Sequence, residues 1–170
     1  MTMIVIWGSI IASGVAIAQG TVLQFAEIAG VRPDLVLVLL LFIANKNGMM
    51  TGQLVAVVVG VVLDVLGAAP LGFHVLVYSV VAALFGITRG KVFVDPVFIP
   101  VLFGAVGVLL KGLVAGFLAS MFGLEPVLTS LFAPAYWLEL AYTAVLTPVF
   151  FAILSFLPFL QPDRRRGEVF

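Results

Sequence analysis

Six long apolar stretches fill most of the chain, and short groups of proline, glycine, asparagine and charged residues separate them. These stretches cover residues 3–25, 33–45, 50–66, 71–88, 97–122 and 135–157. In a helix that rises about 1.5 Å per residue, about 20 residues cross the hydrocarbon core of a bilayer. We therefore predict an all-α, polytopic bundle of six transmembrane helices, in which the third and fourth are near the minimum spanning length.

The second stretch, residues 33–45, is too short to cross a bilayer of ordinary thickness. Pro33 suits the first position of a helix, and Asp34 suits the positive end of the helix dipole. Asn45, Asn47 and Gly48 end the stretch. We predict that this helix lies inside the bundle or spans a locally thinned region of membrane.

The composition excludes a soluble globular domain. Hydrophobic residues make up 64% of the 170 residues and charged residues 9%, whereas about a quarter of a soluble domain is charged. We therefore predict a single integral membrane domain over residues 1–170, with the lipid bilayer as its solvent. No basic face is available to follow a phosphate backbone, so nucleic acid is not expected as a partner.

The basic residues predict how the chain is oriented. Positive residues collect in cytoplasmic loops, and six of them fall on one predicted side of the membrane: Lys46, Arg89, Lys91, Arg164, Arg165 and Arg166. Only Arg32 falls in a loop on the other side. This distribution predicts that both termini are cytoplasmic. The first apolar stretch has no positive residue before it and continues past Ala18, so we expect a retained helix rather than a cleaved signal peptide.

Two charged residues lie within predicted spans, where each costs at least about 2.5–3.5 kcal/mol at the membrane centre. Lys111 belongs to the fifth stretch and Glu139 to the sixth, and the two lie at a comparable depth because these helices run in opposite directions. We predict that they form a buried ion pair that fixes the register of the two helices. A polar ligand or proton site is the alternative interpretation.

Asp64 and His74 flank a short connection that contains Gly67, Pro70 and Gly72, so the two side chains could meet there. A metal site needs more ligands than the nearby sequence offers. His74 is the only histidine, and no set of nucleophile, base and orienting group can be assembled around it. We therefore expect neither an enzyme nor a bound cofactor or metal.

Small residues recur every fourth position along the first stretch, at Gly8, Ala12, Ala16 and Gly20. Such a stripe allows two helix backbones to approach closely. It predicts either packing within the chain or docking of a transmembrane helix from a partner protein.

Two segments and one proline resemble the rod shape-determining protein MreD family. The first is VRPDLVL at residues 31–37, and the second is GVVLDVLGAAPLGFHVL at residues 60–76. The late proline of the last stretch also matches. The residues that carry the resemblance are Arg32, Pro33, Asp34, Gly60, Asp64, Leu71, Gly72, His74 and Pro148.

The resemblance implies a non-catalytic inner-membrane component of the bacterial cell-elongation machinery. Such a protein binds the bitopic protein MreC, and together they link the MreB cytoskeleton to peptidoglycan synthesis by cell-wall synthases. It also implies a fold similar to the substrate-binding subunit of energy-coupling-factor transporters, with a second copy of the chain as a further possible partner. The alternative function is that of such a subunit in vitamin or metal uptake.

Overall fold

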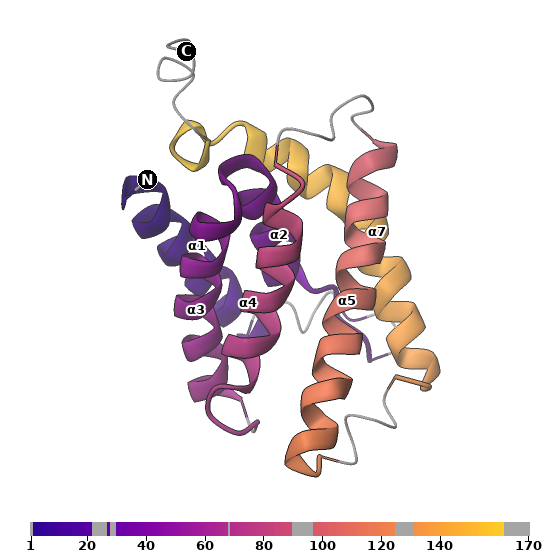
Figure 1. The fold of residues 1–170 in the computed structure, drawn as a ribbon. Helices are drawn as coiled ribbons and strands as arrows, with labels where there is room; N and C mark the ends of the chain where they lie inside the picture. The colour runs from indigo at the N-terminus through magenta and orange to yellow at the C-terminus, as the bar shows by residue number, and fades with distance from the viewer. Residues whose placement is uncertain are drawn as a thin grey trace.

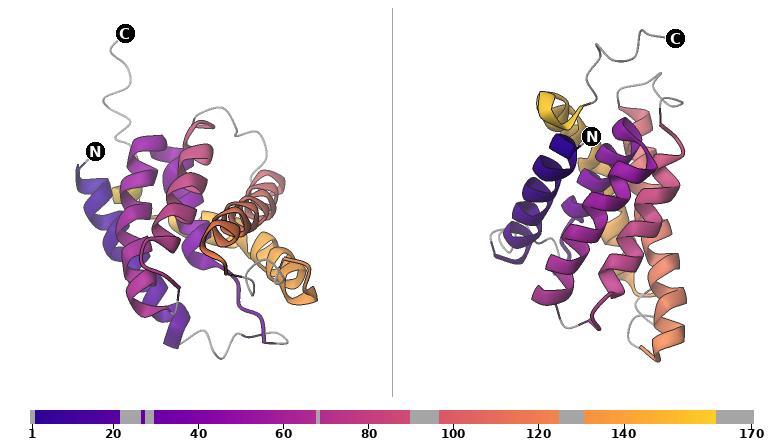
Figure 2. Two further views of the ribbon diagram at one scale, coloured as in Figure 1. Left: turned by 60° about the horizontal axis from the view of Figure 1, so that its bottom comes forward. Right: turned by 60° about the vertical axis from the view of Figure 1, so that its left-hand side comes forward.

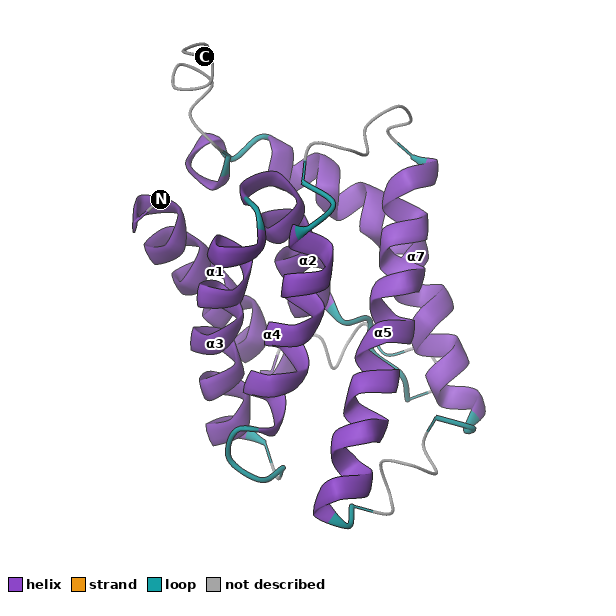
Figure 3. Cartoon of the chain, viewed as in Figure 1, coloured by secondary structure: helices purple, strands orange, loops and turns teal. Residues whose placement is uncertain are grey.

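The computed structural model describes residues 2–21, 27, 30–67, 69–89, 97–124 and 131–161. The described part of the chain is all-helical, with six α-helices and one short 3-10 helix (Figure 3). Three features discussed above lie outside the described residues: the end of the predicted first helix at residues 22–25, Lys91, and the three arginines at 164–166.

The helices follow the predicted stretches closely. They are α1 (Thr2–Thr21), α2 (Leu35–Asn47), α3 (Met49–Leu66), α4 (Phe73–Gly86), α5 (Phe98–Phe122) and α7 (Pro134–Ser155), followed by the 3-10 helix η2 (Pro158–Leu160). Four of them, α1, α3, α5 and α7, are long and apolar enough to cross a membrane. The other two, α2 and α4, are shorter apolar helices.

The predicted helix starts need correction where a carboxylate sets the boundary. Pro33 is not the first residue of α2: the helix begins at Leu35 and runs to Asn47, with Asp34 as its N-cap. The fourth helix begins at Phe73 instead of residue 71, because residues 71 and 72 form a turn with Gly72 at φ 93°. At the other end, α4 stops at Gly86 and α7 stops at Ser155, two residues before each predicted end.

The short helix α2 occupies the centre of the bundle. All of its residues except Lys46 are buried, and it contacts α1, α3, α4, α5 and α7 (Figure 1). An apolar helix without a polar face is stable where apolar neighbours surround it on every side. The short length of this apolar stretch, which prevents α2 from spanning an ordinary membrane, is thus a property of the helix at the core of the fold.

Around α2, four of the other helices form two tightly packed pairs. In the first pair, α3 lies against α4 so closely that a Cβ on Gly60 would come within 2.5 Å of the Val75 Cα. In the second pair, α5 lies against α7, with Gly104 facing Thr147 and Gly112 facing Tyr136. In the left view of Figure 2, α5 and α7 lie together on one side of the bundle. The two pairs meet through α2 and through direct packing of α4 against α5, where the Phe85 and Phe103 rings are in contact.

Candidate functional site

Asp34 is the centre of a polar cluster inside the bundle. As the N-cap of α2, its Oδ1 accepts a hydrogen bond of 2.9 Å from the Leu37 amide. Its Oδ2 accepts a hydrogen bond of 2.9 Å from the Tyr78 hydroxyl of α4 and another of 2.8 Å from the Lys111 Nζ of α5. The first amides of a helix lack internal partners, so a carboxylate at this position stabilises the helix start. Because α2 is short, this helix start lies within the bundle.

Lys111 joins two carboxylates. Its Nζ lies 2.8 Å from Asp34 Oδ2 and 2.5 Å from Glu139 Oε1 of α7. The three side chains are 19%, 9% and 24% exposed respectively, so none is solvated as it would be at a protein surface. The expected partners, Lys111 and Glu139, are thus in contact, and Asp34 is a third member that the sequence alone did not indicate.

A second layer of hydrogen bonds holds the start of α2 in place. The Asp34 amide donates to the Thr143 Oγ1 of α7 at 3.0 Å. From α1, the Gln19 Nε2 donates to the Pro33 carbonyl at 2.8 Å, and the Gln19 Oε1 accepts from the Val36 amide at 3.1 Å. Four helices around α2 therefore contribute polar groups to the few residues that begin it.

A second carboxylate, Asp64, organises the turn between α3 and α4. It accepts hydrogen bonds of 2.8 Å from the Gly72 amide, the His74 amide and, depending on the tautomer, the His74 Nδ1. Asp64 is 4% exposed and therefore buried, whereas the His74 side chain is 29% exposed. This arrangement is a cap on the first turn of α4 supplied by the preceding helix.

The remaining residues of the family resemblance occupy separate places. Arg32 forms an ion pair with Glu27. Leu71 is exposed in the turn before α4, and Pro148 lies inside α7, which continues past it. The His74 and Tyr78 rings are stacked with their centroids 6.3 Å apart, which places the Asp64 turn beside the Asp34 cluster.

The small-residue stripe of α1 is buried along most of its length and exposed at its last position. Gly8, Ala12 and Ala16 are buried, and a Cβ on Gly8 would lie 3.1 Å from Ile43 and 3.2 Å from Val55. Gly20 is exposed. Three of the four positions thus pack within the chain and are not accessible to a partner helix.

A cavity of about 440 Å³ opens beside the cluster. Glu139 belongs to both, since its carboxylate pairs with Lys111 and its side chain forms part of the cavity wall. The cavity lies between the segment before α2 and the start of α7, and its described lining residues are Glu27, Gly30, Val31, Arg32, Ala133, Ala135, Tyr136 and Glu139. The Tyr136 hydroxyl donates to the Val108 carbonyl at 3.0 Å and so holds this wall against α5.

Sequence reasoning missed Asp34, Tyr78, Gln19 and Thr143 as members of the cluster. One signal could have found Asp34: an acid that begins a helix too short to reach the membrane surface must lie at depth, where it needs a cation. The other three are uncharged and resemble ordinary helix residues. Among the described residues, no group of three or more histidine, cysteine or acidic side chains is placed to hold a metal ion.

Comparison with models of protein families matches residues 1–157 to the family described as rod shape-determining protein MreD. No curated protein and no solved structure matches the chain.

Proposed function

Because the chain belongs to the MreD family of rod shape-determining membrane proteins, we propose that it is a non-catalytic component of the bacterial cell-elongation machinery. In this role it binds the bitopic protein MreC, and the two proteins link the MreB cytoskeleton to the cell-wall synthases. The observation that carries the proposal is the family match over residues 1–157, which includes all six helices. A second copy of the chain is a further proposed partner.

The form of the molecule supports a role in binding other membrane proteins. Its loops are short, so partners are recognised mainly through helix faces, where close packing supplies the affinity. Large apolar side chains are exposed along α1 and α5, including Ile6, Ile10, Leu113 and Phe117. These faces contact lipid or the transmembrane helix of a partner.

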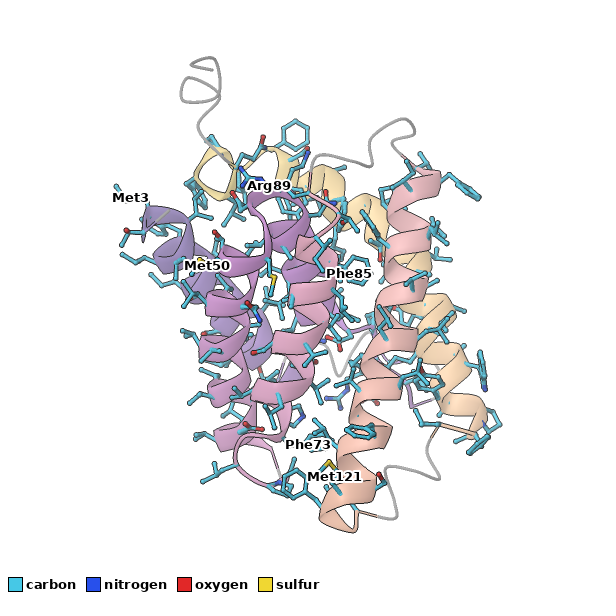
Figure 4. The ribbon with its side chains drawn as sticks, viewed as in Figure 1. Met3, Met50, Phe73, Phe85, Arg89 and Met121 are labelled. Atoms are coloured by element: carbon cyan, nitrogen blue, oxygen red, sulfur yellow. The ribbon has the colours of Figure 1, made fainter. Side chains whose placement is uncertain are left out.

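We propose that the chain lies in the bacterial inner membrane with both termini in the cytoplasm. Figure 4 places Met3 and Arg89 at one end of the bundle and Phe73 and Met121 at the other. The 3-10 helix η2 lies at the Met3 end, since the Phe159 ring packs against the Trp7 ring of α1 with their centroids 5.6 Å apart. The beginning and end of the described bundle therefore share a side with Arg89, in accordance with the positive-inside rule.

Depletion of the protein in a rod-shaped host tests the proposal. We expect the cells to become round, and expression of the intact chain to restore the rod. A photo-crosslinking residue at Leu113 or Ile10 is expected to give an adduct identified as MreC, whereas the same residue at Val59, which is buried, gives none. Rods that persist without the protein, or adducts that never contain MreC, would contradict the proposal.

The cavity beside Glu139 favours one alternative, the substrate-binding subunit of an energy-coupling-factor transporter. A volume of about 440 Å³ with tyrosine, arginine and glutamate in its wall is within the range of small-molecule sites. Titration of the purified protein with vitamins and with nickel or cobalt ions separates the two functions. Binding at micromolar concentration or below supports the transporter, and its absence together with rounded cells on depletion supports the shape-determining role.

A further inference from the structure

The cavity and the charged cluster meet at one carboxylate. Glu139 is 24% exposed and lies in the cavity wall, while its Oε1 is bound to Lys111 on the side of the bundle core. In the described part of the chain, Lys111 is the only basic side chain paired with Glu139. The carboxylate therefore presents its other side to a space that a ligand can enter.

The charges around this space do not balance. Lys111 faces two carboxylates, Asp34 and Glu139, and a single lysine neutralises one of them. The basic residue of the described cavity wall, Arg32, is paired with its own carboxylate, Glu27. The described cluster and cavity wall together carry one excess negative charge, and it belongs to the partly buried group of Asp34, Lys111 and Glu139.

The same imbalance extends over the described part of the half of the bundle that contains the cavity. This half holds the N-terminal ends of α2, α4 and α7 and the C-terminal ends of α3 and α5. Among the described residues of this half, two are basic, Arg32 and Lys111, and four are acidic, Glu27, Asp34, Asp64 and Glu139. Positive charge is therefore scarce among the described residues on this side of the molecule.

We propose that the cavity beside Glu139 is a binding site for a ligand that carries a cationic nitrogen, an ammonium or a guanidinium group. The cation pairs with the Glu139 carboxylate, and the Tyr136 ring in the same wall offers a further favourable surface for it. This pairing neutralises the excess charge, and a charge-assisted hydrogen bond in a partly buried site is stronger than one at an exposed surface. The site does not depend on the shape-determining role, since it requires no partner protein, and it is the same cavity that favours the transporter alternative.

An anionic ligand fits this cavity less well. Both basic groups near it already contact carboxylates, and the Arg32 Nη1 also donates to the Gln19 carbonyl at 3.3 Å. A carboxylate or phosphate would therefore add negative charge where negative charge is already in excess.

The test uses the full chain in lipid nanodiscs and three small probes of similar size. These are the amides of Nα-acetyl-lysine, Nα-acetyl-norleucine and Nα-acetyl-glutamate, which are cationic, neutral and anionic. We expect the lysine probe to bind at least about tenfold more tightly than the norleucine probe. The reason is that a hydrogen bond to a charged group contributes more free energy than a tenfold change in affinity requires. The glutamate probe is expected not to bind. Equal affinity for the lysine and norleucine probes overturns the proposal.

Two variants locate the site. Glu139→Gln leaves Lys111 paired with Asp34, so we expect a folded protein that has lost the preference for the lysine probe. Asp64→Asn makes the same acid-to-amide change at a turn that does not border the cavity, and it is expected to retain the preference.

Melting temperatures of both variants verify folding. If Glu139→Gln does not fold, Glu139→Asp keeps the charge and is expected to keep the preference. An unchanged preference in folded Glu139→Gln, or its loss in folded Asp64→Asn or Glu139→Asp, contradicts the site.

Discussion

Two carboxylates cap helices in this bundle, and they do so under different conditions. Asp34 caps its own helix, α2, within the bundle, and it also binds Lys111 and the Tyr78 hydroxyl. Asp64 caps α4 from the preceding helix, and its partners are backbone amides and the His74 ring. One cap is therefore part of a buried charge network, and the other belongs to a local turn.

The difference shows how depth changes the requirement on a carboxylate. At the α3–α4 turn, amides and a partly exposed histidine satisfy Asp64 without a permanently charged partner. Within the bundle, an isolated carboxylate is costly, and a lysine from another helix offsets that cost. Because the Tyr78 hydroxyl also binds Asp34 and the lysine attracts Glu139 as well, the Asp34 cap connects α2, α4, α5 and α7, whereas the Asp64 cap connects only α3 and α4.

The largest loss of stability is expected when Lys111, the cation shared by Asp34 and Glu139, is removed. Lys111→Met leaves Asp34 and Glu139 close together without a counter-charge, and breaking a buried pair costs about 3–5 kcal/mol of stability. Lys111→Met with Glu139→Gln leaves one stranded carboxylate, so its free energy of unfolding should lie between those of the single variant and the native protein. Unfolding in mixed detergent micelles measures the free energy of unfolding of the native protein, the single variant and the double variant. A double variant as unstable as the single one would show that the two residues do not interact as described.

The next effect concerns the cap of α2. Asp34→Ala removes both the hydrogen bond to Leu37 and the acceptor of Tyr78, while Lys111 keeps Glu139. Since the loss of an N-cap costs about 0.5–2 kcal/mol and an unsatisfied buried group about 1–3 kcal/mol, we expect a loss of about 2–4 kcal/mol. Asp34→Asn retains the cap and should be less destabilising. If Asn and Ala have equal effects, the capping hydrogen bond contributes nothing measurable.

A smaller effect is expected at the second cap. Asp64→Ala removes the acceptor of the Gly72 and His74 amides, and loss of a cap predicts a decrease of about 1–2 kcal/mol in stability. Hydrogen exchange of the first turn of α4 should rise, while exchange at the start of α2 stays unchanged. Increased exchange at both helix starts would mean that the two caps are coupled and not independent.

The smallest loss of stability is expected on removal of the Tyr78 hydroxyl, which lies between the two caps. Tyr78→Phe removes one hydrogen bond to Asp34 and keeps the ring beside His74, so a loss of about 0.5–1.5 kcal/mol is expected. In the Asp34→Ala background the same change should have almost no effect, because its acceptor is already gone. A full loss in that background would assign the effect to packing of the ring.

Much of this arrangement could be predicted from the amino-acid order. Apolar run lengths indicated six helices and the unusual position of α2, because length relative to the bilayer is a property of the sequence. The contact between Lys111 and Glu139 followed from their depth in neighbouring antiparallel stretches. Asp64 and His74 could be brought together because a short glycine- and proline-containing turn separates them.

The tertiary structure alone decided which faces point inward. Lipid and protein interior are both apolar, so hydrophobic periodicity does not distinguish the two sides of a membrane helix. For this reason the sequence left open whether Gly8, Ala12 and Ala16 pack within the chain. It also did not identify Lys111, which is distant along the chain, as the cation that pairs with Asp34. The cavity beside Glu139 likewise exists because the start of α7 lies next to the segment before α2, a proximity that only the packed bundle creates.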